Sequence, residues 1–394
     1  MPVPSPQRYA SGGRRQGIDF QTLDNAIAAI TRIRATDPRI TPVLTLRHLS
    51  VLTELPFLFL RRTVARQERV GYRTIFLKKR IPGRSSMRRI SIPPKSLAHV
   101  QNWLVQNVLQ YTSAHPASFA FHPDSSPILS AEQHPNTKWL LKVDIHDFFH
   151  SISEGTVASI FSRLGFPKLL AFELGRLCTI PCNRGPSRNP KPHPSPIEFY
   201  RSDFEGYLPQ GAATSPMLAN LAMSMTDRRL AALAEKFGFR YSRYADDLAF
   251  SSPNDHALAD LQKLKRNVFH ILNSSGFRPN LRKTVIRGPG ARRIVLGMLV
   301  DGKEPRLSKE FKDNIRLHLY YLTSPQHGPQ KHALSRKTGV SSMYHHVRGL
   351  IAWARHVEKT YGEEALAKFK AVNWPPIQPR MVHCSLDDLM DKDD

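Results

Sequence analysis

The sequence predicts an α+β fold from the order of its helix and strand patterns, and two of the predicted strands are acidic. Helical patterns dominate both ends of the chain, whereas strand patterns alternate with helices between them. Two strand segments that lie far apart along the chain carry acidic side chains: Asp144 and Asp147 close the first, and Asp246 and Asp247 interrupt the second. An unpaired buried charge is very costly. These residues therefore either lie on exposed turns or hold something positive.

The first part of the chain is expected to be helical, with one basic hairpin. Residues 1–17 are rich in Pro, Ser and Gly and should be frayed, and short helices should follow from Asp19 to about Leu60. Between Tyr72 and Pro94, "RTIFLKK" and "RRISI" flank a Gly/Ser turn, which predicts a hairpin. A helix over Ser96–Gln110, with Ser96 at its cap, should come next.

The middle of the chain contains the two acidic segments. Lys138–Phe149 is a predicted strand, and Tyr241–Phe250 ("YSRYADDLAF") alternates apolar and polar residues as a hairpin does. The Pro density of residues 182–196 predicts an irregular insertion. The remaining predicted elements are helices over Ser153–Phe166, Ser215–Gly238, His256–Gly276, Lys309–Leu322 and Tyr344–Gly362, a strand pair or a tight β-turn within Arg292–Gly302, and a disordered acidic tail over Leu386–Asp394.

Net charge separates the possible classes of partner. The 394 residues include 57 Lys and Arg against 32 Asp and Glu, which gives a formal net charge of +25. Such a balance predicts a polyanionic partner, with nucleic acid as the first candidate. An anionic membrane surface is the second, but neither a basic amphipathic helix nor a lipidation signal accompanies the charge.

Cysteine usage and hydropathy indicate the compartment. The 3 cysteines, Cys178, Cys182 and Cys384, are too few for a disulfide framework and favour a reducing environment. Cys178 and Cys182 could form a metal cluster with His193, but the spacing is loose, so ordinary thiols are the favoured interpretation. The sequence contains no membrane-length apolar run and no signal-peptide core. We expect a soluble, cytoplasmic protein.

Convergence of the acidic segments would create a cation site. Three or four carboxylates that meet cannot stay fully ionised without cations. Hard divalent ions, above all Mg²⁺, suit oxygen ligands, and two of them can activate an attacking hydroxyl and stabilise a leaving pyrophosphate. An isolated Asp-Asp pair is more often a turn signal. The aromatic frame and the first acidic strand favour the cation site here.

Several segments within about residues 70–302 resemble the motifs of reverse transcriptases, in the order in which that family carries them. They are the basic hairpin, "KVDIHDFFHSI", "LPQGAATSP", "YADD", "FRPNLRKT" and the primer-grip turn "RRIVLGMLVD". The resemblance implies a right-hand polymerase architecture. It places an N-terminal helical extension at 1–70, fingers at 71–135, a palm with an interleaved fingers segment and the insertion at 136–304, a helical thumb at 305–385 and the tail at 386–394.

Within this family the chain is most similar to retron reverse transcriptases. "SAEQH" keeps Ala131 and His134 of a retron segment but has Ser130 in place of Asn, and Val295-Leu-Gly297 lacks the Thr of the retron Val-Thr-Gly turn. Another defence-associated reverse transcriptase, making repetitive or untemplated cDNA, is an alternative. A noncatalytic RNA-binding scaffold on the same fold is a further one, although it has no reason to retain a costly acidic cluster.

The resemblance also implies roles for single residues. Asp144, Asp246 and Asp247 would be catalytic ligands of two Mg²⁺ ions, with the backbone carbonyl of Ile145 completing one shell. The implied substrate-binding residues are Lys79, Arg88, Asp147, Phe148, Phe149, Gln210 and Lys283, and the implied primer and template contacts are Tyr244, Ala245 and Gly297.

These substrate roles differ in kind. Phe149 matches the ring that excludes a sugar 2′-hydroxyl, and one of the two Phe rings should lie in the core. Lys79 and Arg88 would bind the triphosphate, although neighbouring basic residues leave the register open. Lys283 would protonate the pyrophosphate or form a simple salt bridge. Asp147 would face the triphosphate through its backbone or act as a structural carboxylate, and Gln210 would contact nucleotide and template.

The partners follow from the same resemblance. A structured noncoding RNA would serve as template and primer, dNTPs as substrates, and cDNA joined to that RNA as product. The resemblance further implies a host RNase H that removes template, a separate effector protein and a role in anti-phage defence, without a membrane partner.

Overall fold

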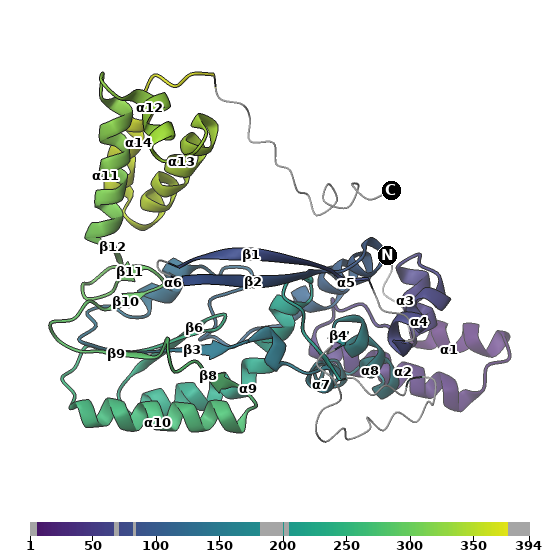
Figure 1. The fold of residues 1–394 in the computed structure, drawn as a ribbon. Coiled ribbons are helices and arrows are strands. Elements are labelled where there is room, and N and C mark those ends of the chain that lie inside the picture. Colours follow the sequence, from purple (N-terminus) through teal and green to yellow (C-terminus); the bar gives the residue numbers. More distant parts are fainter. Residues whose placement is uncertain (1–5, 67–70, 82–83, 182–199, 201–204, 377–394) are drawn as a thin grey trace.

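The computed structural model describes residues 6–66, 71–81, 84–181, 200 and 205–376. The predicted insertion at 182–196 and the predicted tail at 386–394 lie outside them, as do Cys182, His193 and Cys384. Figure 1 shows an elongated lower body, with helices at the N-terminal end and a sheet at the other, and a helical bundle above the sheet.

The first helix begins closer to the N-terminus than the sequence predicts. They are α1 (Pro6–Arg15), α2 (Phe20–Thr36), α3 (Leu46–Leu52) and α4 (Phe57–Ala65). Residues 1–17 were expected to be frayed, and α1 makes that expectation wrong over Pro6–Arg15. No helix of the described residues is both long and apolar enough to cross a membrane.

The basic hairpin is confirmed. β1 (Arg73–Ile81) and β2 (Arg84–Ile92) pair antiparallel along their whole length, with Arg73 opposite Ile92. The hairpin lies above the central sheet in Figure 1. The following helix, α5 (Lys95–Asn107), starts one residue before the predicted cap: Pro94 is its N-cap and provides no side-chain hydrogen bond, so Ser96 lies inside the first turn.

The central sheet contains both acidic segments. Its strands are β3 (Trp139–His146), β6 (Arg240–Tyr244), β7 (Asp247–Ser252), β8 (Arg278–Pro279) and β9 (Val285–Arg287). The order is β6-β7-β3-β8, and β9 also pairs with β3; every pairing is antiparallel. β3 ends three residues before the predicted Phe149, because Asp147 adopts a left-handed backbone with φ 49°.

Strand periodicity separates the two faces of this sheet. The odd-numbered residues from Leu141 to Ile145 join the main buried cluster with residues of α9 (Ser215–Lys236) and α10 (Leu258–Ser274). Figure 1 shows α10 beneath the sheet. The even-numbered residues Leu140, Lys142 and Asp144 therefore face the other side. The sequence thus directs an acid to the face that these helices leave uncovered.

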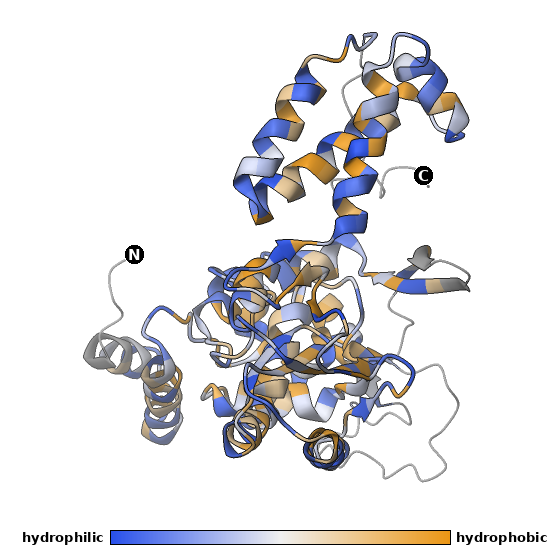
Figure 2. Cartoon of the chain, turned by 90° about the vertical axis from the view of Figure 1, so that its left-hand side faces the viewer, coloured by the Kyte–Doolittle hydropathy of each residue, from blue (hydrophilic) through white to orange (hydrophobic). Residues whose placement is uncertain are grey.

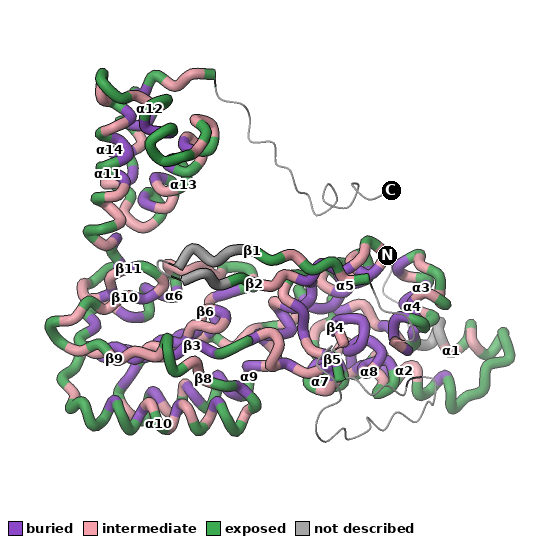
Figure 3. Tube along the Cα trace, in the orientation of Figure 1, coloured by how far each residue is buried: buried purple, intermediate pink, exposed green. Residues whose placement is uncertain are grey.

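The remaining elements of the lower body connect these parts. They are α6 (Pro127–Glu132), α7 (Glu154–Arg163), α8 (Lys168–Leu177), the 3₁₀ turns η1 (Leu109–Tyr111) and η2 (Phe149–Ser151), and the short strands β4 (Ile180–Pro181), β5 (Gly206–Tyr207), β10 (Ile294–Val295), β11 (Met298–Leu299) and β12 (Arg306–Leu307). Figure 3 shows buried residues concentrated around α7 and α8 and along the central strands. Cys178 lies in this core, and burial raises the pKa of its thiol to about 12.

The C-terminal bundle has a core of its own. It consists of α11 (Lys309–Thr323), α12 (Gly328–Ser335), α13 (Val340–Val357) and α14 (Lys359–Lys370), and Figure 2 shows polar and apolar residues alternating along its helices. The prediction of one helix over Tyr344–Gly362 is wrong. Glu358 breaks it, because its carboxylate accepts the Leu307 N–H at 2.7 Å and pairs with Lys312 at 2.6 Å.

A buried histidine just after α6 bonds to two strands of the central sheet. His134 is fully buried; its Nε2 lies 2.7 Å from Ser242 Oγ on β6, and its Nδ1 lies 2.6 Å from Ser251 Oγ on β7. The Ser130 hydroxyl lies 3.1 Å from that of Ser242. Burial lowers the pKa of His134 to about 3. The pair Ser130 and His134 from "SAEQH" therefore has a structural use here.

Acid should weaken the fold through His134. In the unfolded chain this imidazole binds a proton near pH 6.5, whereas the folded protein keeps it neutral down to about pH 3. The unfolded state then binds more protons, so the free energy of unfolding should fall as the pH drops between these values. His134→Gln should reduce that slope by one proton, or about 1.4 kcal/mol per pH unit. Urea unfolding at several pH values measures it, and an unchanged slope would contradict this account.

Candidate active site

Asp144 and Asp247 lie directly opposite each other on neighbouring strands. β3 and β7 pair with these two residues in register, and the Ile145 N–H donates to the Asp246 carbonyl oxygen at 2.9 Å. Directly opposed residues of an antiparallel pair have Cα atoms about 4.5–5.5 Å apart. The structure thus brings Asp144, Asp246 and Asp247 together from segments that are distant in the sequence.

Burial and mutual repulsion act on this acidic group. Burial, followed by the charges of Asp247 and Asp144, raises the pKa of Asp246. Burial also raises the pKa of Asp247; Lys142 opposes this shift and Asp144 adds to it. Each raised pKa means that the ionised carboxylate is less stable here than in water. The group therefore has a physical demand for positive charge.

A polar segment after α10 meets part of that demand. Asn280 Nδ2 donates to Asp144 Oδ1 at 2.8 Å, and Lys283 Nζ donates to Asp144 Oδ2 at 2.5 Å. Burial alone would lower the pKa of Lys283, but the hydrogen bond and charge of Asp144 outweigh burial, and the pKa is raised. Sequence reasoning singled out Lys283 and missed Asn280, although both lie in "FRPNLRKT".

The donor set fits hard divalent cations. Asp144, Asp246 and Asp247 offer carboxylate oxygens, which Mg²⁺ prefers. The pKa values of Asp246 and Asp247 are raised, so a bound cation would stabilise their ionised forms. Among the residues that the structure describes, no three acidic, His or Cys side chains are grouped as a preformed metal site. Asn280 and Lys283 instead engage both carboxylate oxygens of Asp144.

Removing one charge from this cluster should stabilise the fold. Because the pKa of Asp246 is raised, its ionised form opposes folding above the ordinary carboxyl pKa. Asp246→Asn should therefore raise Tm at pH 7.5 in EDTA. Excess Mg²⁺ should raise Tm of the unmodified protein more than that of the variant, because ion binding offsets the repulsion.

The matched control is Asp255→Asn, an exposed acid paired with Lys138 at 2.9 Å. It should leave both Tm values nearly unchanged. Thermal unfolding followed by circular dichroism provides the measurement. A lower Tm for Asp246→Asn in EDTA would contradict the electrostatic account of the cluster.

A buried ion pair that sequence reasoning missed holds the acidic turn. Arg243 binds both carboxylate oxygens of Asp227, at 2.8 and 2.7 Å, and neither side chain is exposed. Arg243 Nη1 also donates to the Ala245 carbonyl at 3.1 Å. Ala245 has φ 56°, a strained backbone for a residue other than Gly. The available signal was Asp227 within the helix pattern of α9 and Arg243 within the strand pattern of β6.

The basic hairpin contacts the loop that carries Gln210. The Ser91 N–H donates to the Gln210 carbonyl at 2.7 Å. Gly211 has φ 125°, and a Cβ there would lie 2.8 Å from the Ser91 carbonyl oxygen. The close approach that requires this Gly is therefore made by β2 of the protein itself. Arg88 is exposed, and the side chain of Lys79 lies outside the described part.

The two Phe rings occupy different environments. Phe148 is buried, with its ring centroid 6.0 Å from that of Phe277. Phe149 is half-buried and lies 5.4 Å from Phe148 and 6.0 Å from Phe121. The side chain of Asp147 is 54% exposed and pairs with His146 at 3.1 Å. The structure does not place the Asp147 carboxylate with the acidic group.

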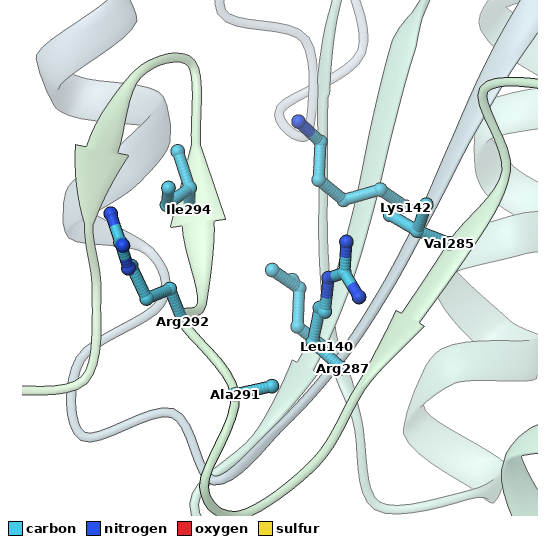
Figure 4. Close-up of a pocket in the computed structure, with 7 residues that line it drawn as sticks. All are labelled: Leu140, Lys142, Val285, Arg287, Ala291, Arg292 and Ile294. Atoms are coloured by element: carbon cyan, nitrogen blue, oxygen red, sulfur yellow. The ribbon is translucent and has the colours of Figure 1, made fainter.

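A basic pocket of about 460 Å³ lies along β3, and one of its lining residues, Lys142, interacts electrostatically with Asp247. It is lined by Leu140, Lys142, Val285, Arg287, Ala291, Arg292 and Ile294. Figure 4 shows Lys142 and Arg287 extending into the same space, while Arg292 points away. Arg292 pairs with Glu310. The β10–β11 hairpin forms one wall and turns tightly, with φ 87° at Gly297.

Comparison with known proteins identifies the family. A family model described as reverse transcriptase (RNA-dependent DNA polymerase) matches residues 77–298. The retron Ec86 reverse transcriptase of Escherichia coli is 30% identical over 302 residues, 76% of this chain and 85% of that protein. The retron Mx162 reverse transcriptase of Myxococcus xanthus is 28% identical over 72% of this chain and 60% of that protein. A telomerase structure from Candida albicans aligns with 77% of this chain and 56% of its own, at 13% identity and a TM-score of 0.43.

The chain belongs to the reverse transcriptase family of RNA-dependent DNA polymerases. Within that family it is of the bacterial retron type. The predicted α+β, right-hand polymerase fold is thereby confirmed, and the matched residues include β3, β6 and β7 with their acidic residues.

Proposed function

We propose that the protein copies part of a structured noncoding RNA into DNA at the acidic group of β3 and β7. The observation that carries the proposal is the register that sets Asp144 opposite Asp247, beside Asp246. A net charge of +25 and the basic pocket next to this group suit a polyanionic template and product.

The same acidic residues would hold the metal. Asp144, Asp246 and Asp247 would bind two Mg²⁺ ions, with the Ile145 carbonyl as a further oxygen donor. Such ions would supply activation of the attacking hydroxyl and charge stabilisation of the leaving pyrophosphate. Lys283 then holds a proton at the site, because its pKa is raised and its ammonium is charged at neutral pH. From there it protonates the leaving group as a general acid.

Other side chains would position substrates. Lys79 and Arg88 on the basic hairpin bind the triphosphate, and Gln210 contacts nucleotide and template. Phe149, whose ring is packed on Phe148 and Phe121, lies against the sugar and excludes a 2′-hydroxyl. Tyr244, Ala245 and Gly297 contact the primer and template. A role in anti-phage defence, with a separate effector protein in the cytoplasm, completes the proposal.

Substitution of Asp246 and Asp247 distinguishes the polymerase hypothesis from the hypothesis of a noncatalytic RNA-binding scaffold. Replacing Asp246 and Asp247 together by Ala should lower Mg²⁺-dependent dNTP incorporation at least about a hundredfold. RNA binding should survive, because the substitution adds no negative charge. Primer extension and filter binding measure the two activities, with Asp255→Asn as control. Incorporation that persists in the double variant would contradict the site assignment.

The nucleic acid that copurifies with the protein tests the product. A retron-type reaction should yield a short DNA joined to one RNA, because a single structured RNA acts as primer and template. Sequencing of the bound nucleic acid, before and after ribonuclease treatment, shows its composition and linkage. Long tandem copies or homopolymer would instead favour a defence-associated enzyme with different product chemistry.

A further inference from the structure

The C-terminal bundle contains a polar pocket that the proposed polymerase site does not use. Its volume is about 350 Å³, within the range of about 300–1,000 Å³ found for small-molecule sites. Its polar lining residues come from α11, the turn after α12, and α13: Asn314, His318, Arg336, Thr338, Ser342 and His346. None of them is acidic, so the pocket favours an anionic ligand.

His318 is the buried polar group of this pocket. It is only 4% exposed, and its Nδ1 lies 2.9 Å from His332 Nε2. Among the described residues its Nε2 has no hydrogen-bond partner, and this atom is not sealed in the core. Nδ1 is engaged by His332 and the ring lines the pocket, so Nε2 is the nitrogen left for a ligand bound there. A ligand in the pocket can therefore complete the hydrogen bonding of this ring.

The neighbouring rings keep His318 in place. His332 stacks on Tyr321 with centroids 5.2 Å apart, and His346 packs edge-on against His318 at 5.4 Å. Burial, together with the charges of His332 and His346, lowers the pKa of His318 to about 4. The ring is therefore neutral near pH 7. A neutral imidazole can accept or donate a hydrogen bond to the edge of a nucleobase.

The other end of the pocket is suited to phosphate. α13 begins there, and its N-cap Gly339 provides no side chain for the first-turn N–H groups. Such a helix start favours anions. Arg336 lies beside it, and its guanidinium makes no ion pair with the residues that the structure describes. A free guanidinium and the Ser342 hydroxyl next to a helix start form an anion site of the kind that binds phosphate oxygens.

We propose that this pocket binds one unpaired nucleotide of a nucleic-acid strand, with its phosphate at Arg336 and the start of α13 and its base against His318 and His346. The proposal rests on the proposed function, since it places a contact to the template RNA or its cDNA in the bundle. RNA and DNA share the phosphate and base chemistry involved. Binding in the pocket differs from general charge attraction because it requires a base that is not in a duplex, whereas charge attraction acts on single strands and duplexes alike.

The test compares neighbouring charges in the full-length protein. Arg336→Gln should weaken binding of a fluorescein-labelled single-stranded RNA or DNA 12-mer about tenfold, the value of one charge-assisted hydrogen bond. Lys337→Gln, which removes the same charge next to the pocket, should change binding less than about twofold. Asn314→Leu provides a second pocket variant. Fluorescence anisotropy measures Kd, and thermal unfolding confirms that each variant is folded.

The probes separate the possible results. A loss with either single strand, absent with a blunt 12-base-pair duplex, supports the pocket, and the strand affected identifies RNA or cDNA as its source. Equal Kd values for Arg336→Gln and Lys337→Gln, or the same loss on the duplex, overturn it. Primer extension by the unmodified protein is measured in parallel. If that activity is present while the variants bind alike, the pocket fails and the proposed function stands.

Discussion

The antiparallel register between β3 and β7 is the constraint on which the site depends. It sets Asp144 against Asp247 and joins Ile145 to the carbonyl of Asp246. Because side chains alternate along a strand, a slip of one residue would send Asp144 into the core beneath and a core residue to the acidic group. The apolar residues of β3 that pack with α9 and α10 oppose any such slip. Hydrophobic burial on one face thus positions charges on the other.

Two polar networks stabilise an arrangement that carboxylate repulsion alone would oppose. Arg243 and Asp227 pair beneath the turn and hold the Ala245 carbonyl. Asn280 and Lys283 bind Asp144 from the opposite side. Removal of one partner from a buried pair is strongly destabilising, so the turn is fixed firmly. The Lys283 contact is half-exposed, with 52% of its side chain accessible, and can be exchanged for another cation at lower cost. The buried Arg243–Asp227 pair thus supports the backbone of the turn, whereas the more exposed Lys283 occupies the site itself.

The sequence predicted the parts of this molecule that have strong local patterns, and the rest depends on tertiary context. Alternation around "YADD" and between Arg73 and Ile92 predicted both hairpins, because strand periodicity is encoded residue by residue. Asn280 and the Asp227–Arg243 pair were missed, since a polar side chain reveals its partner only when distant segments pack. The helix expected over Tyr344–Gly362 broke at Glu358 for the same reason: its partners, Leu307 and Lys312, lie on other elements. The close approach at Gly211 also depends on β2, which no local pattern indicates.

The central claim is that acids from two distant segments bind divalent cations side by side. It is tested most directly by a crystal structure with Mn²⁺, an RNA template, a DNA primer and a non-hydrolysable dNTP, with manganese located by anomalous scattering. The account predicts manganese coordinated by carboxylates of both Asp144 and Asp246, with Lys283 released from Asp144 toward the triphosphate. Manganese bound elsewhere, with Asp144 still held by Asn280 and Lys283 while the nucleotide is in place, would contradict it.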